Sequence, residues 1–496
     1  MFLSLLFVLA FTLFSRAAPF DHDNGGILYR FSPTSTNETE GLLSWAELRE
    51  WDLWQMNHSH IDVYFPRRAI AEAELGLLPF PLPASTSHRI MIDREGMETG
   101  TSTSCERSHN RHDDDPAKRK HATLPIAAAA GTRTSWDVRS LSNATFHERY
   151  HTLDEIESFA RDLAAAYPRQ LSIVPLGHSG EGREMFALEI VADAADAPAG
   201  GGAPSSTSSD GLDHENERSH DPNLQVVLGG KRKDRTSPPV TRCGFLVTGA
   251  QHAREWVASA SALYVAHALL ADRSEAYSLA RLLERHSFYI VPVPNPDGYV
   301  YTWERDRFWY KNRLQLGPDA RCVGVDMNRN WGYKWKRAPR PEDPCSYWYP
   351  GTRPFQAPEV NNMDNYFSRL PRLKGFLDLR SYGQMLSTPF SYSCKRSPKD
   401  AEDQLEAISG AAHAIKKSHG TLFTTGALCS TLYRASGNIV DWLYKKMGVK
   451  YSFAAHLRDT GTYGYALPEQ WIRPVGEETA KMIEYIANFI ADKECR

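Results

Sequence analysis

The stretch Gly249-Ala250-Gln251-His252-Ala253-Arg254-Glu255-Trp256 stands at the junction of two apolar segments. The run before it, residues 245–248, is typical of a buried strand, and residues 256–270 repeat apolar side chains with a helical period. His252 and Glu255 therefore lie where a strand ends and a helix begins, which is where open α/β sheets bind ligands. An imidazole and a carboxylate at this spacing can hold one metal ion, typically zinc, with a third protein ligand. The alternative for this stretch alone is a capping Glu and a packed His.

Strands and helices alternate on both sides of this stretch. We expect helices over residues 150–167 and 478–491, and strands over 171–175, 185–191, 288–293, 375–379 and 451–455. This alternation predicts an α/β fold for residues 137–496, with a doubly wound mixed sheet and helices on both faces. Residues 194–242 are rich in Gly, Ser, Pro and Asp, and we interpret them as a disordered surface insertion.

The N-terminal part of the chain has a different organisation. Residues 1–18 have the apolar core and small-residue end of a secretory signal peptide. Within 19–99, strands are expected at 27–31, 61–65 and 88–92, with a helix capped by Ser44 that runs to Trp51, which suggests a small ferredoxin-like module. Residues 100–136 form a charged linker whose dibasic sites suit proteolytic processing.

Composition narrows the classes of partner. The chain has 496 residues, 42% hydrophobic residues and a formal net charge of −3, which favours neither nucleic acid nor a membrane surface as partner. No later segment is long and apolar enough to span a membrane. Secretion, possibly to a vacuole, agrees with three glycosylation tripeptides, at Asn37, Asn57 and Asn143. Seven cysteines indicate disulfides with one thiol left over, and Cys105, Cys243 and Cys495 show no readable pattern.

Four more motifs follow His-x-x-Glu in order. They are Asn295-Pro296-Asp297-Gly298, Val325-Asp326-Met327-Asn328-Arg329-Asn330-Trp331, Tyr433-Arg434-Ala435-Ser436-Gly437 and Leu457-Arg458-Asp459-Thr460-Gly461. With these five motifs the sequence resembles the zinc metallocarboxypeptidases of the A/B type. The resemblance implies a carboxypeptidase fold for 120–496 and an inhibitory activation domain at 27–95. It also implies the disulfides Cys322–Cys345 and, as in some members, Cys394–Cys429.

Much of the family's recognition machinery is present. By resemblance, His252 and Glu255 are two zinc ligands, and Asn328 and Arg329, supported by Arg254, grip the terminal carboxylate of a peptide. The remaining positions are a mobile capping tyrosine, two outer subsite residues and the base of the specificity pocket, which are Tyr433, Ser381, Tyr382 and Val440. A valine in this pocket implies preference for an apolar C-terminal side chain.

The catalytic positions are different. Arg380 stands where the third zinc ligand should be, and an arginine has no lone pair to offer a metal. His456 replaces the glutamate that serves as general base, and Tyr310 replaces the arginine that stabilises the oxyanion. Zinc binding, if it occurs, is therefore expected at an incomplete site. We expect Arg380 to pair with Glu255 in the vacated metal position; the alternative is that it points to solvent.

This pattern resembles secreted fungal metallocarboxypeptidase-like proteins that are regarded as inactive and linked to cell-wall organisation and biogenesis. The first hypothesis is a pseudoenzyme that binds the C-termini of peptides or proteins, with its N-terminal module as an intramolecular prodomain. The second is an active zinc carboxypeptidase in which His252, Glu255 and His456 hold the metal. The third is a structural role with a vestigial cleft.

Overall fold

The computed structural model describes most of two folded units. The described residues are 27–49, 51–56, 60–65, 68–78, 87–93, 136–193, 242–317, 320–336 and 344–495. The expected signal peptide, nearly all of the linker and of the insertion, and Asn57 lie outside these ranges.

The larger unit is built on an eight-stranded mixed sheet with strand order β11-β10-β12-β9-β7-β8-β6-β5. The four central strands, β12, β9, β7 and β8, are mutually parallel, so their carboxyl ends meet at one edge. The strands are β5 (Leu171–His178), β6 (Glu184–Ile190), β7 (Cys243–Thr248), β8 (His286–Val291), β9 (Leu373–Arg380), β10 (Met385–Thr388), β11 (Thr424–Ala427) and β12 (Tyr451–His456).

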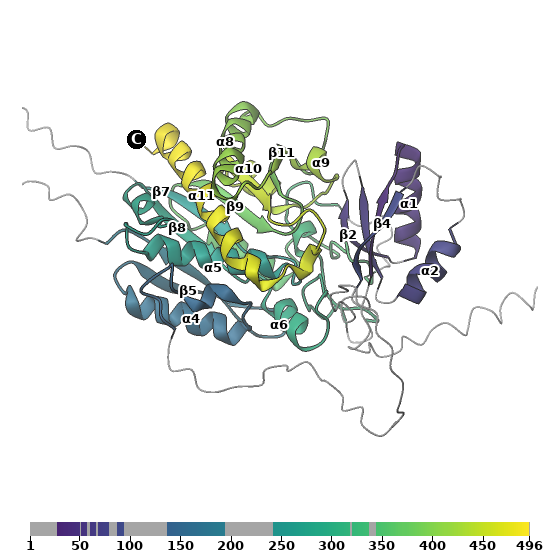
Figure 1. Ribbon diagram of the computed structural model, residues 1–496, viewed down its shortest axis with the longest axis horizontal. Coiled ribbons are helices and arrows are strands. Elements are labelled where there is room, and N and C mark those ends of the chain that lie inside the picture. Colours follow the sequence, from purple (N-terminus) through teal and green to yellow (C-terminus); the bar gives the residue numbers. More distant parts are fainter. Residues whose placement is uncertain are drawn as a thin grey trace, which may run out of the picture.

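Helices cover both faces of this sheet (Figure 1). One face packs against α4 (Leu153–Ala166), α5 (Trp256–Leu270), α8 (Ala401–His419) and α11 (Ile472–Glu494), and the other against α7 (Pro358–Phe367) and α10 (Ile439–Lys445). Shorter helices, α6 (Pro296–Glu304) and α9 (Leu428–Thr431), lie in connections. Along β7, Phe245 and Val247 enter the first core while Leu246 enters the second. A strand buried on both faces is therefore apolar throughout, and the predicted fold class is confirmed.

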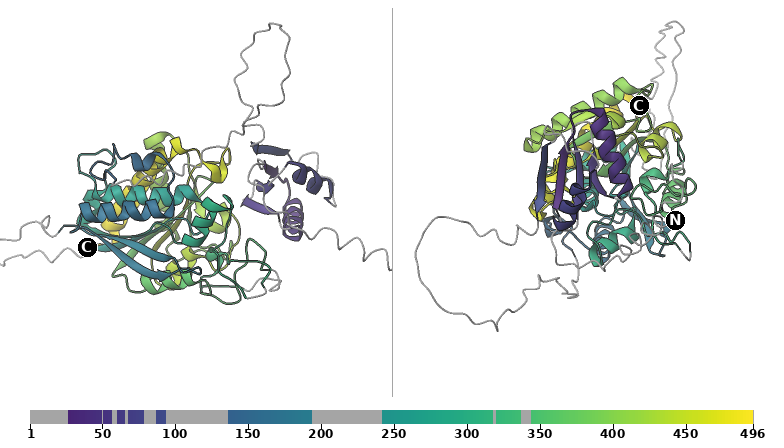
Figure 2. Two further views of the ribbon diagram at one scale, coloured as in Figure 1. Left: turned by 90° about the horizontal axis from the view of Figure 1, so that it is seen from below. Right: turned by 90° about the vertical axis from the view of Figure 1, so that its right-hand side faces the viewer.

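The N-terminal module contains β1 (Ile27–Ser32), α1 (Thr36–Leu48), β2 (Asp52–Met56), β3 (Ile61–Phe65), α2 (Arg68–Gly76) and β4 (Ser87–Asp93). Its strands pair in the order β2-β3-β1-β4, all antiparallel. The expected ferredoxin-like fold remains a prediction for this partly described module. Figures 1 and 2 show the module at one end of the larger unit, opposite the C-terminus, with α1 and α2 on its outer side.

One predicted helix start is wrong. Helix α1 begins at Thr36, eight residues before the expected cap Ser44, and ends before Trp51. The reason lies in Ser35 and Glu38. The Ser35 hydroxyl accepts from the Glu38 amide at 3.2 Å, and the Glu38 carboxylate accepts from the Thr34 amide at 2.7 Å. These contacts satisfy backbone amides at the helix start. Ser44 lies within the helix, where the backbone amides already bond to carbonyls of the preceding turn.

Three disulfides link segments of the larger unit. The expected pairs Cys322–Cys345 and Cys394–Cys429 form, and Cys243 pairs with Cys495. The last bond joins the start of β7 to the end of α11 across 252 positions of sequence, a separation that hides the pairing from motif analysis. Cys105 lies outside the described residues. Among the helices of the described part, none is long and apolar enough to cross a membrane.

Two buried histidines, His147 and His267, contact each other beside α5. His267 on α5 donates from Nε2 to the Val138 carbonyl at 2.9 Å, so its Nδ1 accepts from His147 Nε2 at 3.0 Å. The His267 ring is neutral in this arrangement, because a proton on its Nδ1 would face the N–H of His147. Burial and the neighbouring His267 lower the pKa of His147 well below its usual range, so this ring is neutral too. Burial lowers the pKa of His267 to about 4.

This pair makes stability depend on pH. A histidine whose pKa falls on folding stabilises the fold fully above the unfolded value of about 6.5, and that stability is lost as pH falls toward the folded value. We expect His267 to account for up to about 3 kcal/mol of unfolding free energy between pH 7 and pH 4. Denaturant unfolding at pH 7, 5.5 and 4 measures the loss. A His267→Gln variant, which keeps a donor for Val138, should show a shallower pH dependence; equal slopes would contradict the assignment.

Candidate ligand-binding cleft

The expected site residues meet at the carboxyl edge of the central strands. His252 and Glu255 follow β7, Arg380 ends β9, and His456 ends β12. Arg380 and His456 are direct neighbours in the register of the parallel pair β9 and β12. Strand geometry therefore explains why residues more than 200 positions apart converge here.

The turn after β7 depends on close backbone packing. A side chain at Gly249 would place its Cβ 2.1 Å from the carbonyl oxygen of Pro292, so only glycine fits. The side chain of Asn295 then holds the turn by donating to the carbonyl of Gln251 at 3.0 Å. His252 lies in this turn, and Glu255 immediately precedes the first residue of α5.

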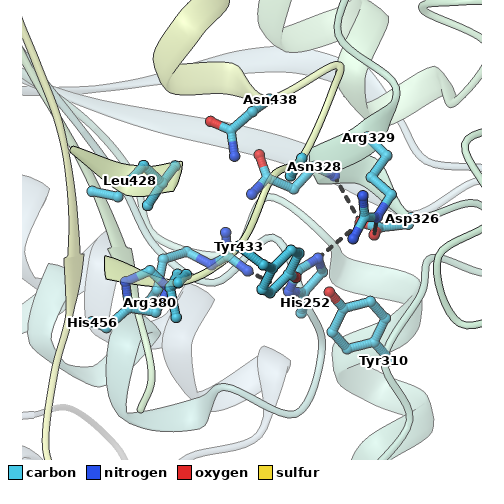
Figure 3. Close-up of a pocket in the computed structure, with 13 residues that line it drawn as sticks. His252, Tyr310, Asp326, Asn328, Arg329, Arg380, Leu428, Tyr433, Asn438 and His456 are labelled. Atoms are coloured by element: carbon cyan, nitrogen blue, oxygen red, sulfur yellow. Dashed lines mark hydrogen bonds and ion pairs between the residues drawn. The ribbon is translucent and has the colours of Figure 1, made fainter. Parts of the chain in front are cut away.

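Arg380 lies in the cleft, where its guanidinium contacts both expected metal ligands. Figure 3 shows its side chain reaching toward His252. Its Nε donates to Glu255 Oε2 at 2.9 Å, and its Nη2 donates to Glu255 Oε1 at 3.2 Å and to His252 Nδ1. All three side chains are at least nine-tenths buried. The structure thus has the expected Arg380–Glu255 pair, and the alternative of a solvent-facing arginine is wrong.

The pair keeps a buried carboxylate ionised. Burial alone would raise the pKa of Glu255, but the charge of Arg380, together with its hydrogen bonds, outweighs burial and lowers the pKa to about 2. Removing either partner would leave the other as an uncompensated buried charge, the costly outcome for such pairs.

His456 is a neutral side chain at the position of the expected general base. Burial and the adjacent charge of Arg380 lower its pKa to about 3. Its Nδ1 is buried and has no hydrogen-bond partner among the described residues. A base with so low a pKa is a poor proton acceptor at neutral pH, but the nitrogen remains available for a hydrogen bond to a ligand.

Tyr310 has become part of the wall of the cleft. Its ring stacks on the His252 imidazole with centroids 3.7 Å apart, and the Arg254 guanidinium lies 4.7 Å from its ring centre. Burial and nearby Asp326 raise the pKa of Tyr310 well above its usual range, so the side chain is neutral. Arg307, three residues before Tyr310, stacks on Trp256 and donates to the backbone carbonyls of Arg254 and Tyr465.

The expected carboxylate grip is assembled beside this centre. Arg329 forms an ion pair with Asp326, with Nε and Oδ2 3.0 Å apart, and Asn328 accepts from the Ile439 amide at 3.2 Å through its side-chain oxygen. The rings of Tyr433 and Trp348 lie over the Arg329 guanidinium, 5.6 and 5.1 Å away. Tyr433 also packs against the apolar core of the N-terminal module.

Acidic residues of the module engage two other expected ligand-binding side chains. Asp52 accepts from Arg254 Nη1 at 2.8 Å, and Arg254 is fully buried. Asp62 accepts from the Tyr382 hydroxyl at 2.7 Å and from Arg30 at 2.6 Å, while Arg30 also donates to the Thr460 carbonyl. Trp54 adds ring contacts and accepts from the Tyr465 hydroxyl through its carbonyl.

The hollows left in the cleft are small. One lies between the larger unit's own side chains and one beneath module residues 53–56, and each has a volume of about 40 Å³. That is room for a few water molecules and none for a peptide residue. Ser381 lines the second hollow with its hydroxyl unpartnered among the described residues. Val440 on α10 is buried in the second core and lies outside both linings, whereas Leu428 and Ala454 line the first hollow.

Sequence reasoning missed the acids that organise the cleft. Asp326 bonds His252 and pairs with Arg329, although the sequence pointed only to its neighbours Asn328 and Arg329. The position of Asp326 inside the motif at 325–331 was the sequence feature that could have pointed to it. Asp52 and Asp62 carried no motif, because their role depends on how the module sits on the larger unit.

Comparisons with known proteins agree with this geometry. The model of the zinc carboxypeptidase family matches residues 156–482, about two thirds of the chain. The chain belongs to the zinc carboxypeptidase family.

Two fungal relatives are similar over nearly the whole chain. A metallocarboxypeptidase A-like protein of Trichophyton verrucosum is 31% identical over 92% of this chain and 91% of its own. The inactive metallocarboxypeptidase ecm14 of Sclerotinia sclerotiorum is 31% identical over 94% of this chain and 73% of its own. Together with the residues found at the expected catalytic positions, the relative named inactive supports a pseudoenzyme of the family.

Solved structures show the same fold. The crystal structure of thrombin activatable fibrinolysis inhibitor matches with a TM-score of 0.68 at 24% identity, covering 95% of this chain and all of the other. Carboxypeptidase A from Helicoverpa armigera matches with a TM-score of 0.69 at 22% identity, covering 95% of this chain and 99% of its own.

The residues at the family's zinc position do not fit the ion. Zinc needs lone pairs from three protein side chains, and here the third is a guanidinium that already donates to the other two. Within the described part of the chain, no three His, Cys, Asp or Glu side chains are grouped to hold a metal.

Metal content tests this conclusion. We expect purified wild-type protein to carry less than about 0.1 zinc per chain, because Arg380 fills the position. An Arg380→His variant completes a His, Glu, His ligand set and should bind about one zinc per chain. Elemental analysis after dialysis against zinc measures both. Near-stoichiometric zinc in the wild type would contradict the assignment. The variant Arg161→His, at an exposed position of α4, controls for adventitious zinc binding to an added histidine.

Proposed function

We propose that this protein is a non-catalytic receptor for the C-termini of peptides or proteins. The proposal rests on a contrast within one cleft, between side chains suited to bind a carboxylate and side chains unsuited to catalysis. Asn328, Arg329 and Tyr433, the side chains suited to a terminal carboxylate, keep their places, while the catalytic positions hold Arg380, His456 and Tyr310.

Unpartnered polar atoms in the cleft support ligand binding. Buried polar groups are nearly always hydrogen-bonded, so exceptions call for an explanation. His456 Nδ1 and Ser381 Oγ both lack partners among the described residues, and both line the cleft. A bound peptide backbone, with a donor and an acceptor per residue, has the groups to satisfy them.

The same geometry argues against hydrolysis. A peptide carbonyl in this cleft would meet a guanidinium that is already bonded to Glu255 and His252, and a histidine too weakly basic to activate water. The alternative, an active zinc enzyme using His252, Glu255 and His456, requires Arg380 to leave its buried pair with Glu255. Release of C-terminal amino acids, abolished by a chelator, would support that alternative.

We propose further that the module is an intramolecular ligand of the cleft. The carboxylate of Asp52 accepts a hydrogen bond from Arg254, and that of Asp62 accepts one from the hydroxyl of Tyr382. Tyr433 packs against the module core. These contacts use side chains that a peptide would use, so module docking and peptide binding exclude one another. Processing within 100–136 is the proposed route of release.

Secretion, with possible vacuolar delivery and a role in cell-wall biogenesis, completes the proposal. It rests on the expected signal peptide at 1–18, the domain plan (19–99, 100–136, 137–496) and the family resemblance. Two proposed glycosylation sites, Asn37 and Asn143, are exposed.

Carboxylate recognition is testable in the full chain with Asp52→Ala and Trp54→Ala, here termed the opened variant. We expect a peptide acid ending in leucine to bind about 10- to 100-fold more tightly than its amide, because charged hydrogen bonds contribute about 1.5–3 kcal/mol. Titration calorimetry measures both affinities. Arg329→Gln in this background should remove the preference and the exposed Arg161→Gln should not; equal binding of acid and amide would sink the proposal.

The covering role of the module has its own test. The wild-type chain should bind the same peptide acid at least about 10-fold more weakly than the opened variant, since the peptide must first displace Asp52 from Arg254. Protease nicking of the linker should bring the wild type toward the opened variant. Equal affinities before and after opening would contradict the proposal, provided that both proteins unfold at similar denaturant concentrations.

A further inference from the structure

A chain of hydrogen bonds and ion pairs connects Arg380 with Arg329. We propose that Arg380 is a positioning residue for C-terminal carboxylate recognition: its guanidinium takes over the structural work of a metal ion and, through His252 and Asp326, sets the orientation of Arg329. This inference rests on the proposed function. It gives Arg380 a role beyond the replacement of a metal ligand.

The first link joins Arg380 to the former metal ligands. One edge of its planar guanidinium, Nε and Nη2, faces the Glu255 carboxylate, and Nη2 also donates to His252 Nδ1. Nη1 lies 3.5 Å from Asp378 Oδ2. The lone pairs of His252 and Glu255 therefore point at a fixed positive centre, as they would at a cation bound between them.

The second link passes through the imidazole. Because His252 Nδ1 accepts from Arg380, the ring proton resides on Nε2, which donates to Asp326 Oδ1 at 2.8 Å. The Tyr310 ring stacks on the imidazole and limits its rotation. Arg380 thus selects both the tautomer and the orientation of His252, as a metal with an outer carboxylate does for a ligating histidine.

The third link reaches the carboxylate grip. Asp326 Oδ1 also accepts from the Asn328 amide at 3.0 Å, while Asp326 Oδ2 pairs with Arg329 Nε at 3.0 Å. The carboxylate is 1% exposed, so its orientation is set by these partners and not by water. A shift of the His252 ring would move Asp326, and with it both residues that receive a peptide carboxylate.

A neutralising role alone would not need this geometry. If Arg380 only balanced the charge of Glu255, removing both charges together would leave the carboxylate grip intact. If Arg380 positions Arg329, removing both charges together should weaken recognition. The double variant Arg380→Gln/Glu255→Gln separates these roles and strands neither member of the pair, while Asp378 keeps its hydrogen bonds from Thr248 and Gln251.

The experiment measures peptide acid and amide affinities in the opened variant. With Arg380→Gln/Glu255→Gln added, we expect the acid affinity to fall about 10-fold and the preference over the amide to narrow, in line with the effect of losing an outer-shell partner. With Arg380→His instead, binding should be weak in chelator and recover to within about threefold when zinc is added, because a cation again faces His252 Nδ1.

A control pair and a direct readout complete the design. Arg183→Gln/Asp297→Asn removes both charges of an ion pair outside the cleft, between half-buried Arg183 and buried Asp297 with Nη1 and Oδ1 2.9 Å apart, and should leave the acid preference unchanged. Nitrogen-15 NMR of the histidine rings reports the His252 tautomer without any peptide. We expect the Nε2–H tautomer with Arg380 present and its loss in the glutamine double variant.

Two failures are distinguishable. An opened variant that binds acid and amide equally contradicts the proposed function itself. An opened variant that prefers the acid, with a glutamine double variant that keeps both this preference and the His252 tautomer, overturns the positioning role alone. Zinc that binds Arg380→His without changing peptide affinity also overturns it.

Discussion

A permanently charged guanidinium buried at the carboxyl edge of the sheet is the constraint on which the rest of the cleft depends. Arg380 is 6% exposed and can neither lose its proton nor reach bulk water, so the protein must supply acceptors around it. Glu255, His252 and Asp378 do so. Their geometry follows from strand ends that converge at one edge, which is why a metal position accommodates an organic cation.

The three replaced positions are understandable as one electrostatic set. By the family resemblance, a zinc site combines a dication, a carboxylate base and a catalytic arginine, whereas Arg380, a neutral His456 and a neutral Tyr310 occupy the corresponding positions here. A further cation at position 310 would add repulsion to Arg254, Arg329 and Arg380, and an aromatic ring instead stacks favourably with the Arg254 guanidinium. A third ligand position that does not fit zinc thus agrees with the replacement of both charged catalytic partners.

The module completes the charge balance from outside. Its Asp52 neutralises Arg254, which is fully buried, and Asp62 ties Tyr382 to Arg30. Buried ion pairs of this kind contribute modestly to stability, but breaking one is costly, so they hold the interface in one arrangement. The module therefore covers side chains that are proposed to bind a ligand, and the hollows that remain hold only water-sized volumes.

The sequence by itself determined the α/β class and helix α5, because these depend on apolar periodicity. The resemblance of its motifs to those of the zinc carboxypeptidases pointed to side chains such as Arg329 and Arg380, which line the cleft. The sequence also indicated the Arg380–Glu255 pair, since a buried carboxylate needs a partner. Only the tertiary structure decided the Cys243–Cys495 bond, the hub role of Asp326, the core position of Val440 and the contact of Asp52 with Arg254. These depend on distances between remote segments, which no local pattern encodes.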